Sequence, residues 1–194
     1  MPLNIPNMIT LSRIILIPVF VIAFYLPEFS WKHLLVTAVF FFAAVSDWVD
    51  GYLARKLEQQ SAFGAFLDPV ADKLMVATAL VLLVGKHPGT DMAVWLAIPA
   101  AVIVGREITI SALREWMATI GGNDKVRVSL VGKFKTSAQM LAIGFLLFEQ
   151  PLGAFPTLSV GYILLYISAI LTLWSMFMYL KAAWPSLSKE KSGP

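Results

Sequence analysis

The sequence contains no cysteine and only two histidines, His33 and His87, among its 194 residues. A disulfide, a thiolate metal site and a cysteine nucleophile are therefore excluded, and neither histidine has a partner at metal-ligand spacing. Charged residues are also scarce, at 14%, and the formal net charge is only +3. A soluble domain usually carries about 25% charged residues. The shortage of charge therefore argues against a water-soluble domain.

Hydrophobic residues are abundant instead, at 58% of the chain, and the mean hydropathy is +0.76. A helix needs about 20 apolar residues to cross a bilayer. The stretches that approach this length are Met8–Leu26, Trp31–Leu53, Phe63–Gly85, Met92–Met117, Phe134–Phe148 and Leu158–Leu180. We therefore predict an all-α integral membrane bundle of six transmembrane helices. It forms one domain, residues 1–185, followed by a cytoplasmic tail, residues 186–194.

Lysine and arginine are distributed unevenly between the two sides of this predicted bundle. The connectors at residues 26–30, 86–91 and 149–157 carry few of them, whereas the opposite side collects most. By the positive-inside rule, both termini are predicted to be cytoplasmic.

Four aspartates lie at the cytoplasmic end of the second predicted span and the start of the third. Asp47 and Asp50 are three residues apart, and Asp68 and Asp72 are four apart, so each pair shares one face of a helix. The short connector makes the two helices antiparallel neighbours, so the pairs can converge. Carboxylates at membrane depth are costly. Two divalent cations about 3.5–4 Å apart would remove their repulsion and could clamp a phosphoryl group.

Two glycines and an arginine accompany the aspartates. Gly51 and Gly64 let a ligand or a facing helix approach the backbone closely. Arg55 lies about one turn from Asp50 and could bind a diphosphate through two hydrogen bonds. Two other interpretations stay open at this point. The acids could pair with neighbouring Lys and Arg residues, or they could bind a transported cation along an ion pathway.

One pattern joins these residues: Asp47-x-x-Asp50-Gly51-x-x-Ala54-Arg55-x8-Gly64-x-x-x-Asp68-x-x-x-Asp72. It resembles the complete signature of the CDP-alcohol phosphatidyltransferases. Residues 4–13, 106–117 and 132–140 are similar to the bacterial members of this family whose acceptor is sn-glycerol 3-phosphate, and this similarity extends through most of the chain.

The resemblance implies a reaction and a setting. The phosphatidyl group of CDP-diacylglycerol would pass to sn-glycerol 3-phosphate, giving phosphatidylglycerol phosphate and CMP. The protein would be a homodimer that uses two Mg²⁺ (or Mn²⁺) ions. It would lie among the lipids of a bacterial cytoplasmic (inner) membrane, with its active site facing the cytoplasm, and no nucleic-acid partner is expected.

The resemblance also implies a role for each signature residue. Asp47, Asp50 and Asp68 would hold one metal ion, and Asp47, Asp68 and Asp72 the second. Asp72 would also be the general base that takes the proton from the glycerol hydroxyl. The residues that would contact the CDP-lipid are Asp50, Gly51, Ala54, Arg55 and Gly64.

A phosphorylated acceptor needs cations beyond the metal ions. Arg106 lies inside the fourth predicted span, and Arg114 follows about 12 Å along the helix and within roughly 80° of the same face. Both are predicted to bind the acceptor phosphate, although Arg106 could instead form a structural pair with Glu107 or an acid on another helix. Lys133 and Lys135 are further candidates. They lie about 200° apart on a regular helix, and Lys135 is favoured.

Asn7, Thr10 and Arg13 recur at every third residue near the N-terminus. Asn7 could simply cap a helix, and Arg13 could extend to the membrane surface. The resemblance instead suggests a place beside the nucleotide cleft.

Three alternatives to this function remain. The same fold could serve another alcohol acceptor, although the basic residues argue against an uncharged one. A divalent-cation transporter would have acids along a path through the bilayer, whereas here they cluster at one end. A non-catalytic membrane scaffold would not depend on Asp72.

Overall fold

The fold is known from a computed structural model that describes the backbone at residues 5–56, 62–119 and 130–189. Within these ranges, side chains are described except at residues 5–10, 47, 48, 50–56, 62–66, 68, 69, 118, 119, 130–134, 182, 183 and 185–189. The helices are α1 (Ile5–Tyr25), α2 (Lys32–Lys56), α3 (Ala62–Gly85), α4 (Asp91–Thr119), α5 (Leu130–Phe148) and α6 (Thr157–Lys189). The described backbone contains no β-strand, so the prediction of an all-α fold with six helices is confirmed.

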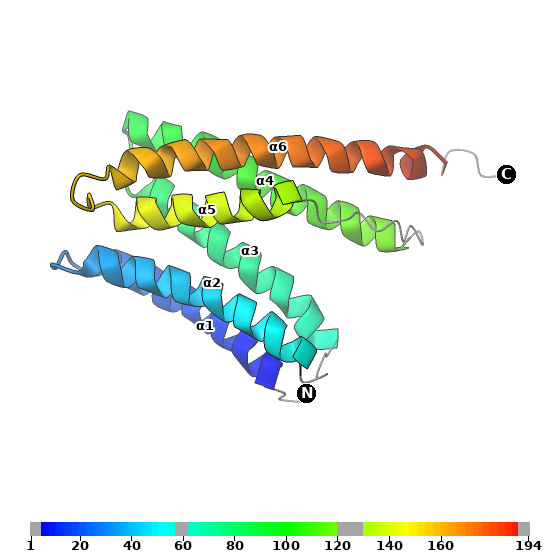
Figure 1. The fold of residues 1–194 in the computed structure, drawn as a ribbon, viewed down its shortest axis with the longest axis horizontal. Coiled ribbons are helices and arrows are strands. Elements are labelled where there is room, and N and C mark those ends of the chain that lie inside the picture. Colours follow the sequence, from blue (N-terminus) through cyan, green and yellow to red (C-terminus); the bar gives the residue numbers. More distant parts are fainter. Residues whose placement is uncertain (1–4, 57–61, 120–129, 190–194) are drawn as a thin grey trace.

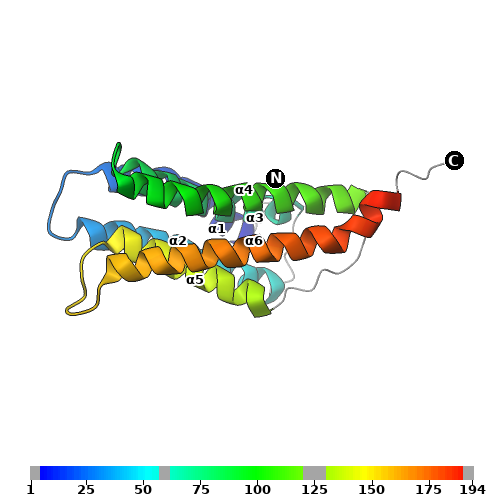
Figure 2. The same cartoon turned by 90° about the horizontal axis from the view of Figure 1, so that it is seen from above.

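The helices run up and down along one long axis (Figure 1). The connectors after α1, α3 and α5 lie at one end, and both chain termini lie toward the other. Helix α6 packs against α4 and α5, whereas α1 packs against α2 and α3 (Figure 2). Helix α3 also contacts α4 and α5 and so joins the two groups.

Each helix contributes at least one fully buried apolar side chain to the interior. These side chains are Phe20, Phe40, Leu80, Ile103, Ile143 and Leu165. Gly144 on α5 lets α2 approach closely, because a Cβ there would lie 2.4 Å from the ring of Phe41. Small residues serve this purpose where helices pack inside membranes.

The outer surface of the bundle is strongly apolar. Among the described side chains, large hydrophobic ones with more than 60% exposure occur on five of the helices, for example Ile22, Phe42, Val81, Ile108 and Phe177. Such extended apolar surface is unusual on a soluble monomer and marks contact with lipid or another protein. The bundle therefore presents to its surroundings the kind of surface that a membrane protein needs.

In the part of the chain that the structure describes, two helical segments are long and apolar enough to cross a membrane, namely Asp91–Met117 and Thr157–Lys181. Within the described residues, the apolar parts of α1, α2 and α5 are shorter, at Leu11–Tyr25, Lys32–Ser46 and Lys135–Phe148. Helix α6 continues to Lys189, nine residues past the predicted end of its span. Hydropathy predicts only the apolar part of a helix. The helix itself continues wherever its backbone hydrogen bonds continue, and here it extends into the segment predicted as a tail.

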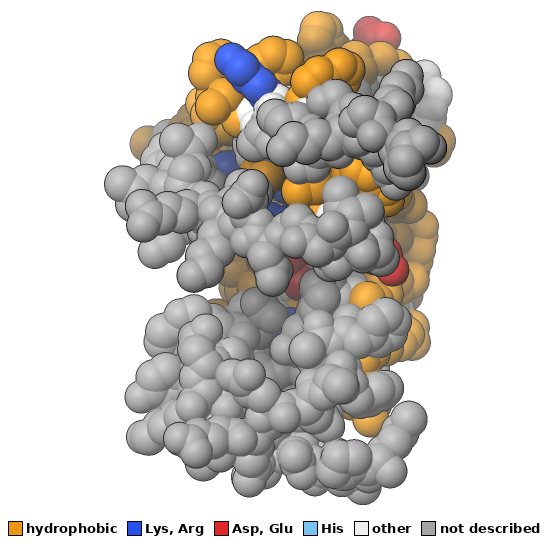
Figure 3. Space-filling view, turned by 90° about the vertical axis from the view of Figure 1, so that its right-hand side faces the viewer, with side chains coloured by type: hydrophobic (Ala, Val, Ile, Leu, Met, Phe, Trp, Pro, Cys, Tyr) orange, Lys and Arg blue, Asp and Glu red, His pale blue; other side chains and the backbone are white. Residues whose placement is uncertain are grey.

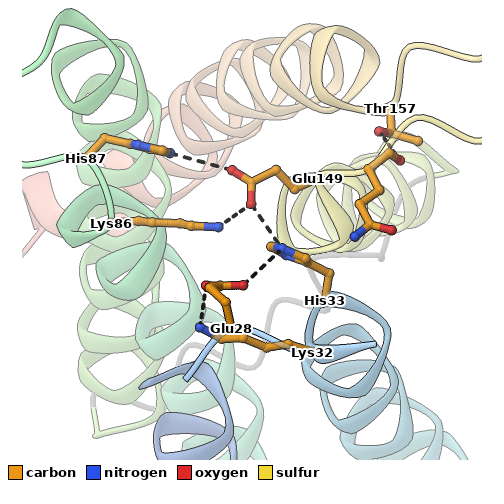
Figure 4. A network of polar contacts seen from close by, with 8 residues as sticks. Glu28, Lys32, His33, Lys86, His87, Glu149 and Thr157 are labelled. Atoms are coloured by element: carbon orange, nitrogen blue, oxygen red, sulfur yellow. Dashed lines mark hydrogen bonds and ion pairs between the residues drawn. The ribbon is translucent and has the colours of Figure 1, made fainter. Parts of the chain in front are cut away.

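Glu149 connects two other elements to the end of α5 (Figure 4). Its carboxylate accepts a hydrogen bond from Lys86 Nζ and lies 3.4 Å from His33 Nδ1 and 3.8 Å from His87 Nε2. Its backbone has a positive φ of 62°, a conformation that usually favours glycine after a helix. The start of α2 and the connectors after α3 and α5 are thus held together at this end of the bundle.

Glu28 extends the same network. It accepts a hydrogen bond of 2.8 Å from Lys32 Nζ and lies 3.7 Å from His33 Nε2. The hydrogen bond from Lys32 holds the pKa of the Glu28 carboxyl below its usual value. Glu28 therefore stays ionised here and keeps His33 between two carboxylates.

Candidate functional site

A polar pocket of about 200 Å³ opens between α3, α4, α5 and α6. Its charged lining residues are Asp72, Lys73, Arg106, Glu107, Arg114 and Lys135. The four cationic and two anionic side chains give an excess of two positive charges. Figure 3 looks at the bundle from the end toward which the termini lie, and it shows basic and acidic side chains among the described hydrophobic ones. A pocket with this charge favours a small anion of charge −2.

Arg106 is held at the pocket by two neighbours. Its Nη1 donates a hydrogen bond of 2.6 Å to Glu107 Oε1, and its Nη2 donates one of 3.0 Å to Ser175 Oγ. The side chain is only 10% exposed. Its buried Nε makes no hydrogen bond to any described residue, and a buried donor without an acceptor is unfavourable. An anion in the pocket would supply such an acceptor.

Lys135 points to the same carboxylate from α5. Its Nζ lies 3.1 Å from Glu107 Oε1, and its side chain is 5% exposed. A buried ammonium group is tolerated when it is paired and hydrogen-bonded, so Glu107 allows both cations to remain inside the bundle. Arg106 thus pairs with Glu107, as the alternative interpretation expected, and it also lines the pocket. Its binding of the acceptor phosphate stays a prediction.

Arg114 reaches the pocket from one end of α4. Its guanidinium carbon lies 5.6 Å from the ring centroid of Tyr179, and that of Arg106 lies 6.0 Å from the same centroid. Both distances are within the range of cation–π attraction. One ring on α6 thus contacts both arginines that the sequence singled out.

Lys73 and Ser111 connect α3 to α4 beside these residues. Lys73 Nζ donates a hydrogen bond to Ser111 Oγ, and Ser111 Oγ donates one of 2.6 Å to the backbone carbonyl of Glu107. The backbone that carries the central carboxylate is thereby fixed from the α3 side.

Asp72 lies between two cavities. It lines the polar pocket, and with Arg13, Ala43, Ala71 and Met75 it also lines a smaller cavity toward α1 and α2. Arg13 is buried, with 4% exposure. Of the three N-terminal residues predicted near the nucleotide cleft, Arg13 is therefore placed beside one of the four aspartates.

The backbone places the remaining signature residues on the helices where they were predicted. Their side chains lie outside the described residues, so their predicted contacts stay predictions. These residues are Asp47, Asp50, Gly51, Ala54 and Arg55 on α2, Gly64 and Asp68 on α3, Lys133 on α5, and Asn7 and Thr10 on α1.

The donor set on α2 and α3 fits a hard divalent cation. Helices α2 and α3 contact each other, and the signature supplies carboxylate oxygens, which Mg²⁺ and Mn²⁺ prefer. Among the described side chains, no group of three or more His, Asp or Glu residues is arranged to hold a metal ion. The predicted metal ligands other than Asp72 fall outside those side chains.

The sequence predictions did not include Ser175 and Tyr179. They are four residues apart on α6 and so share one helix face. Two polar side chains at this spacing in an apolar span were the available signal. Their partners lie on α4, about 70 residues earlier, and only the packing of α6 against α4 brings them together.

Fold and site together define an all-helical protein with an apolar exterior and an anion-attracting pocket beside an aspartate signature. Residues 3–174 match the family described as CDP-alcohol phosphatidyltransferase. The chain belongs to this family.

Curated relatives are similar in sequence to this chain over nearly its full length. The chain is 55% identical over 189 residues to a protein of Pseudomonas fluorescens, covering 97% of this chain and 94% of the relative. A protein of Pectobacterium atrosepticum is 54% identical, covering 94% and 96%, and one of Haemophilus influenzae is 55% identical, covering 96% and 97%. All three relatives are named CDP-diacylglycerol--glycerol-3-phosphate 3-phosphatidyltransferase.

Proposed function

We propose that this protein transfers the phosphatidyl group of CDP-diacylglycerol to sn-glycerol 3-phosphate, giving phosphatidylglycerol phosphate and CMP. The observation that carries the proposal is the pocket in which Arg106, Arg114 and Lys135 gather beside Asp72. Its excess of two positive charges matches the charge of a phosphate monoester. The names of the relatives support the same pair of substrates.

In this reaction Asp72 is the general base. Its carboxylate takes the proton of the acceptor hydroxyl, whose oxygen attacks the phosphorus that carries the diacylglycerol. A new P–O bond forms while the bond to CMP breaks. Proton transfer to a positioned carboxylate typically contributes about 10²–10⁴-fold to the rate. Asp72 suits this role because it lines the pocket in which the acceptor would lie.

The acceptor phosphate is bound by Arg106, Arg114 and Lys135, with Lys133 as a further candidate at the start of α5. Arg106 and Lys135 are largely buried, and cations in such a position bind an anion strongly because little water competes with it. Glu107 keeps Arg106 and Lys135 in place.

The donor lies toward α1 and α2. We assign its CDP-lipid contacts to Asp50, Gly51, Ala54, Arg55 and Gly64, with Asn7, Thr10 and Arg13 beside the nucleotide. Two Mg²⁺ (or Mn²⁺) ions, held by Asp47, Asp50, Asp68 and Asp72, would neutralise the diphosphate when bound. The position of Asp72 between the two cavities supports this division of the site.

We further propose that all six helices lie in a bacterial inner membrane, with both termini and the pocket on the cytoplasmic side, and that the protein is a homodimer. The apolar exterior supports the membrane location. The positions of lysine and arginine support the orientation.

An assay of CMP release tests the reaction. Purified protein is given CDP-diacylglycerol, Mg²⁺ and one acceptor at a time: sn-glycerol 3-phosphate, serine or inositol. We expect CMP only with glycerol 3-phosphate, and none after EDTA treatment. Release with another alcohol but not with glycerol 3-phosphate would overturn the substrate assignment.

A further inference from the structure

Two polar side chains of α6 reach the pocket from a helix that is otherwise mainly apolar. Ser175 accepts a hydrogen bond from Arg106, and Tyr179 presents its ring to Arg106 and Arg114. Neighbouring positions on α6 point outward, and the side chain of Phe177 is 64% exposed. The inward face of α6 therefore contacts the two arginines that carry the charge of the pocket.

The two arginines repel each other, yet both lie against one ring. An aromatic ring carries negative charge density on its faces, so each guanidinium is attracted to it. The ring has no net charge, so it can hold the two cations near one another without neutralising them. A carboxylate in the same place would neutralise part of their charge. The ring therefore leaves the pocket's excess of two positive charges unchanged.

The ring rather than the phenol hydroxyl makes these contacts. The contacts of Tyr179 with Arg106 and Arg114 join its ring to their guanidinium groups. The distances of 6.0 Å and 5.6 Å are measured from the guanidinium carbons to the ring centroid. The contact thus depends on the electrons of the ring.

We propose that Tyr179 is a positioning residue for the acceptor: its ring holds Arg106 and Arg114 together so that both can bind one phosphate group. Ser175 assists by fixing Nη2 of Arg106. Among the described residues, the ring of Tyr179 contacts the two arginines of the acceptor pocket. It therefore determines the affinity for the acceptor and leaves the chemical step unchanged. This inference rests on the proposed function only where the ligand is named as glycerol 3-phosphate.

Three variants separate the ring from the helix. Tyr179→Leu removes the ring, Tyr179→Phe keeps it, and Phe177→Leu makes a similar change on the outward face. In the CMP assay, we expect Tyr179→Leu to raise the KM for glycerol 3-phosphate about tenfold, the effect of losing attraction to two cations. Its kcat and its KM for CDP-diacylglycerol should stay within about twofold of wild type, and Tyr179→Phe and Phe177→Leu should resemble wild type.

A fourth variant covers the case in which Tyr179→Leu does not fold. Pentafluorophenylalanine at position 179 has nearly the shape of phenylalanine, but its ring faces are positive rather than negative. We expect it to raise the KM for glycerol 3-phosphate at least as much as leucine does. If it matches Tyr179→Phe, the ring acts by shape alone and the proposal is wrong.

A binding experiment keeps this test independent of the reaction. Isothermal titration of each purified variant with inorganic phosphate should show about tenfold weaker binding for Tyr179→Leu than for Tyr179→Phe. If wild type releases no CMP, the proposed function fails, while the titration still decides the role of Tyr179. Equal phosphate affinities for these two variants, or equal losses in kcat and in both KM values, would overturn the positioning role.

Discussion

Glu107 holds two buried cations, and its removal should make the protein depend on an added anion. In Glu107→Ala, Arg106 and Lys135 lose the carboxylate that lies 2.6 Å and 3.1 Å from them. Breaking a buried pair costs about 3–5 kcal/mol. Since Glu107 is 27% exposed, solvent screening lowers this to about 2–3 kcal/mol. The expected decrease in Tm is about 5–10 °C.

A phosphate ion should restore much of this loss. It would pair with the same two cations, and a ligand present at about 100 times its Kd adds about 2.7 kcal/mol. We therefore expect inorganic phosphate to raise the Tm of Glu107→Ala more than that of wild type. Thermal unfolding in detergent, with and without phosphate, measures this difference.

The matched control is Glu115→Ala, because Glu115 is an exposed acid on the same helix. Its Tm and its response to phosphate should equal those of wild type. The reasoning would be refuted if Glu107→Ala were as stable as wild type without phosphate. It would equally be refuted if phosphate stabilised the two proteins by the same amount.

The remaining predictions concern the base, the packing and the connector end. Asp72→Asn should keep the Tm of wild type and lose at least about 10²-fold in CMP release; unchanged turnover would remove Asp72 from its role as base. Gly144→Ala should lower stability by about 1–3 kcal/mol, because the new Cβ would overlap the ring of Phe41, and unfolding in denaturant measures the loss. A partly buried ion pair at Glu149 predicts that Glu149→Gln lowers stability by about 1 kcal/mol but leaves CMP release intact; an inactive variant with normal Tm would contradict this.

The six helices could be predicted because long apolar runs stand out clearly in a chain with so little charge. The residues at which the helices end were harder to predict. Helix α6 extends past Leu180 to Lys189, where the residues become polar while the backbone hydrogen bonding continues. Within the described residues, only two of the helices have an apolar segment long enough to cross a membrane. The apolar pattern therefore predicted the number of helices more reliably than the length of each apolar segment.

Site residues could be predicted where the spacing of residues along a single helix was informative. The spacing of Lys133 and Lys135 favoured Lys135, which is buried at the pocket. Glu107 was considered only as an alternative partner of Arg106, although it also binds Lys135. Tyr179 and Ser175 were missed because their partners are on another helix. Contacts of this kind depend on how helices rotate against one another, and hydrophobic periodicity does not determine that rotation for nearly uniform apolar helices.

The network around Glu149 has a consequence for how charged molecules meet the protein. At the connector end, Glu28 and Glu149 balance Lys32 and Lys86, so these residues have little net attraction for an anion. The pocket keeps an excess of two positive charges. Charge is therefore distributed unevenly between the pocket and the connector end. A diffusing anion is drawn toward the pocket rather than toward the connectors. Added salt weakens such long-range attraction, so ionic strength should slow the capture of a soluble acceptor.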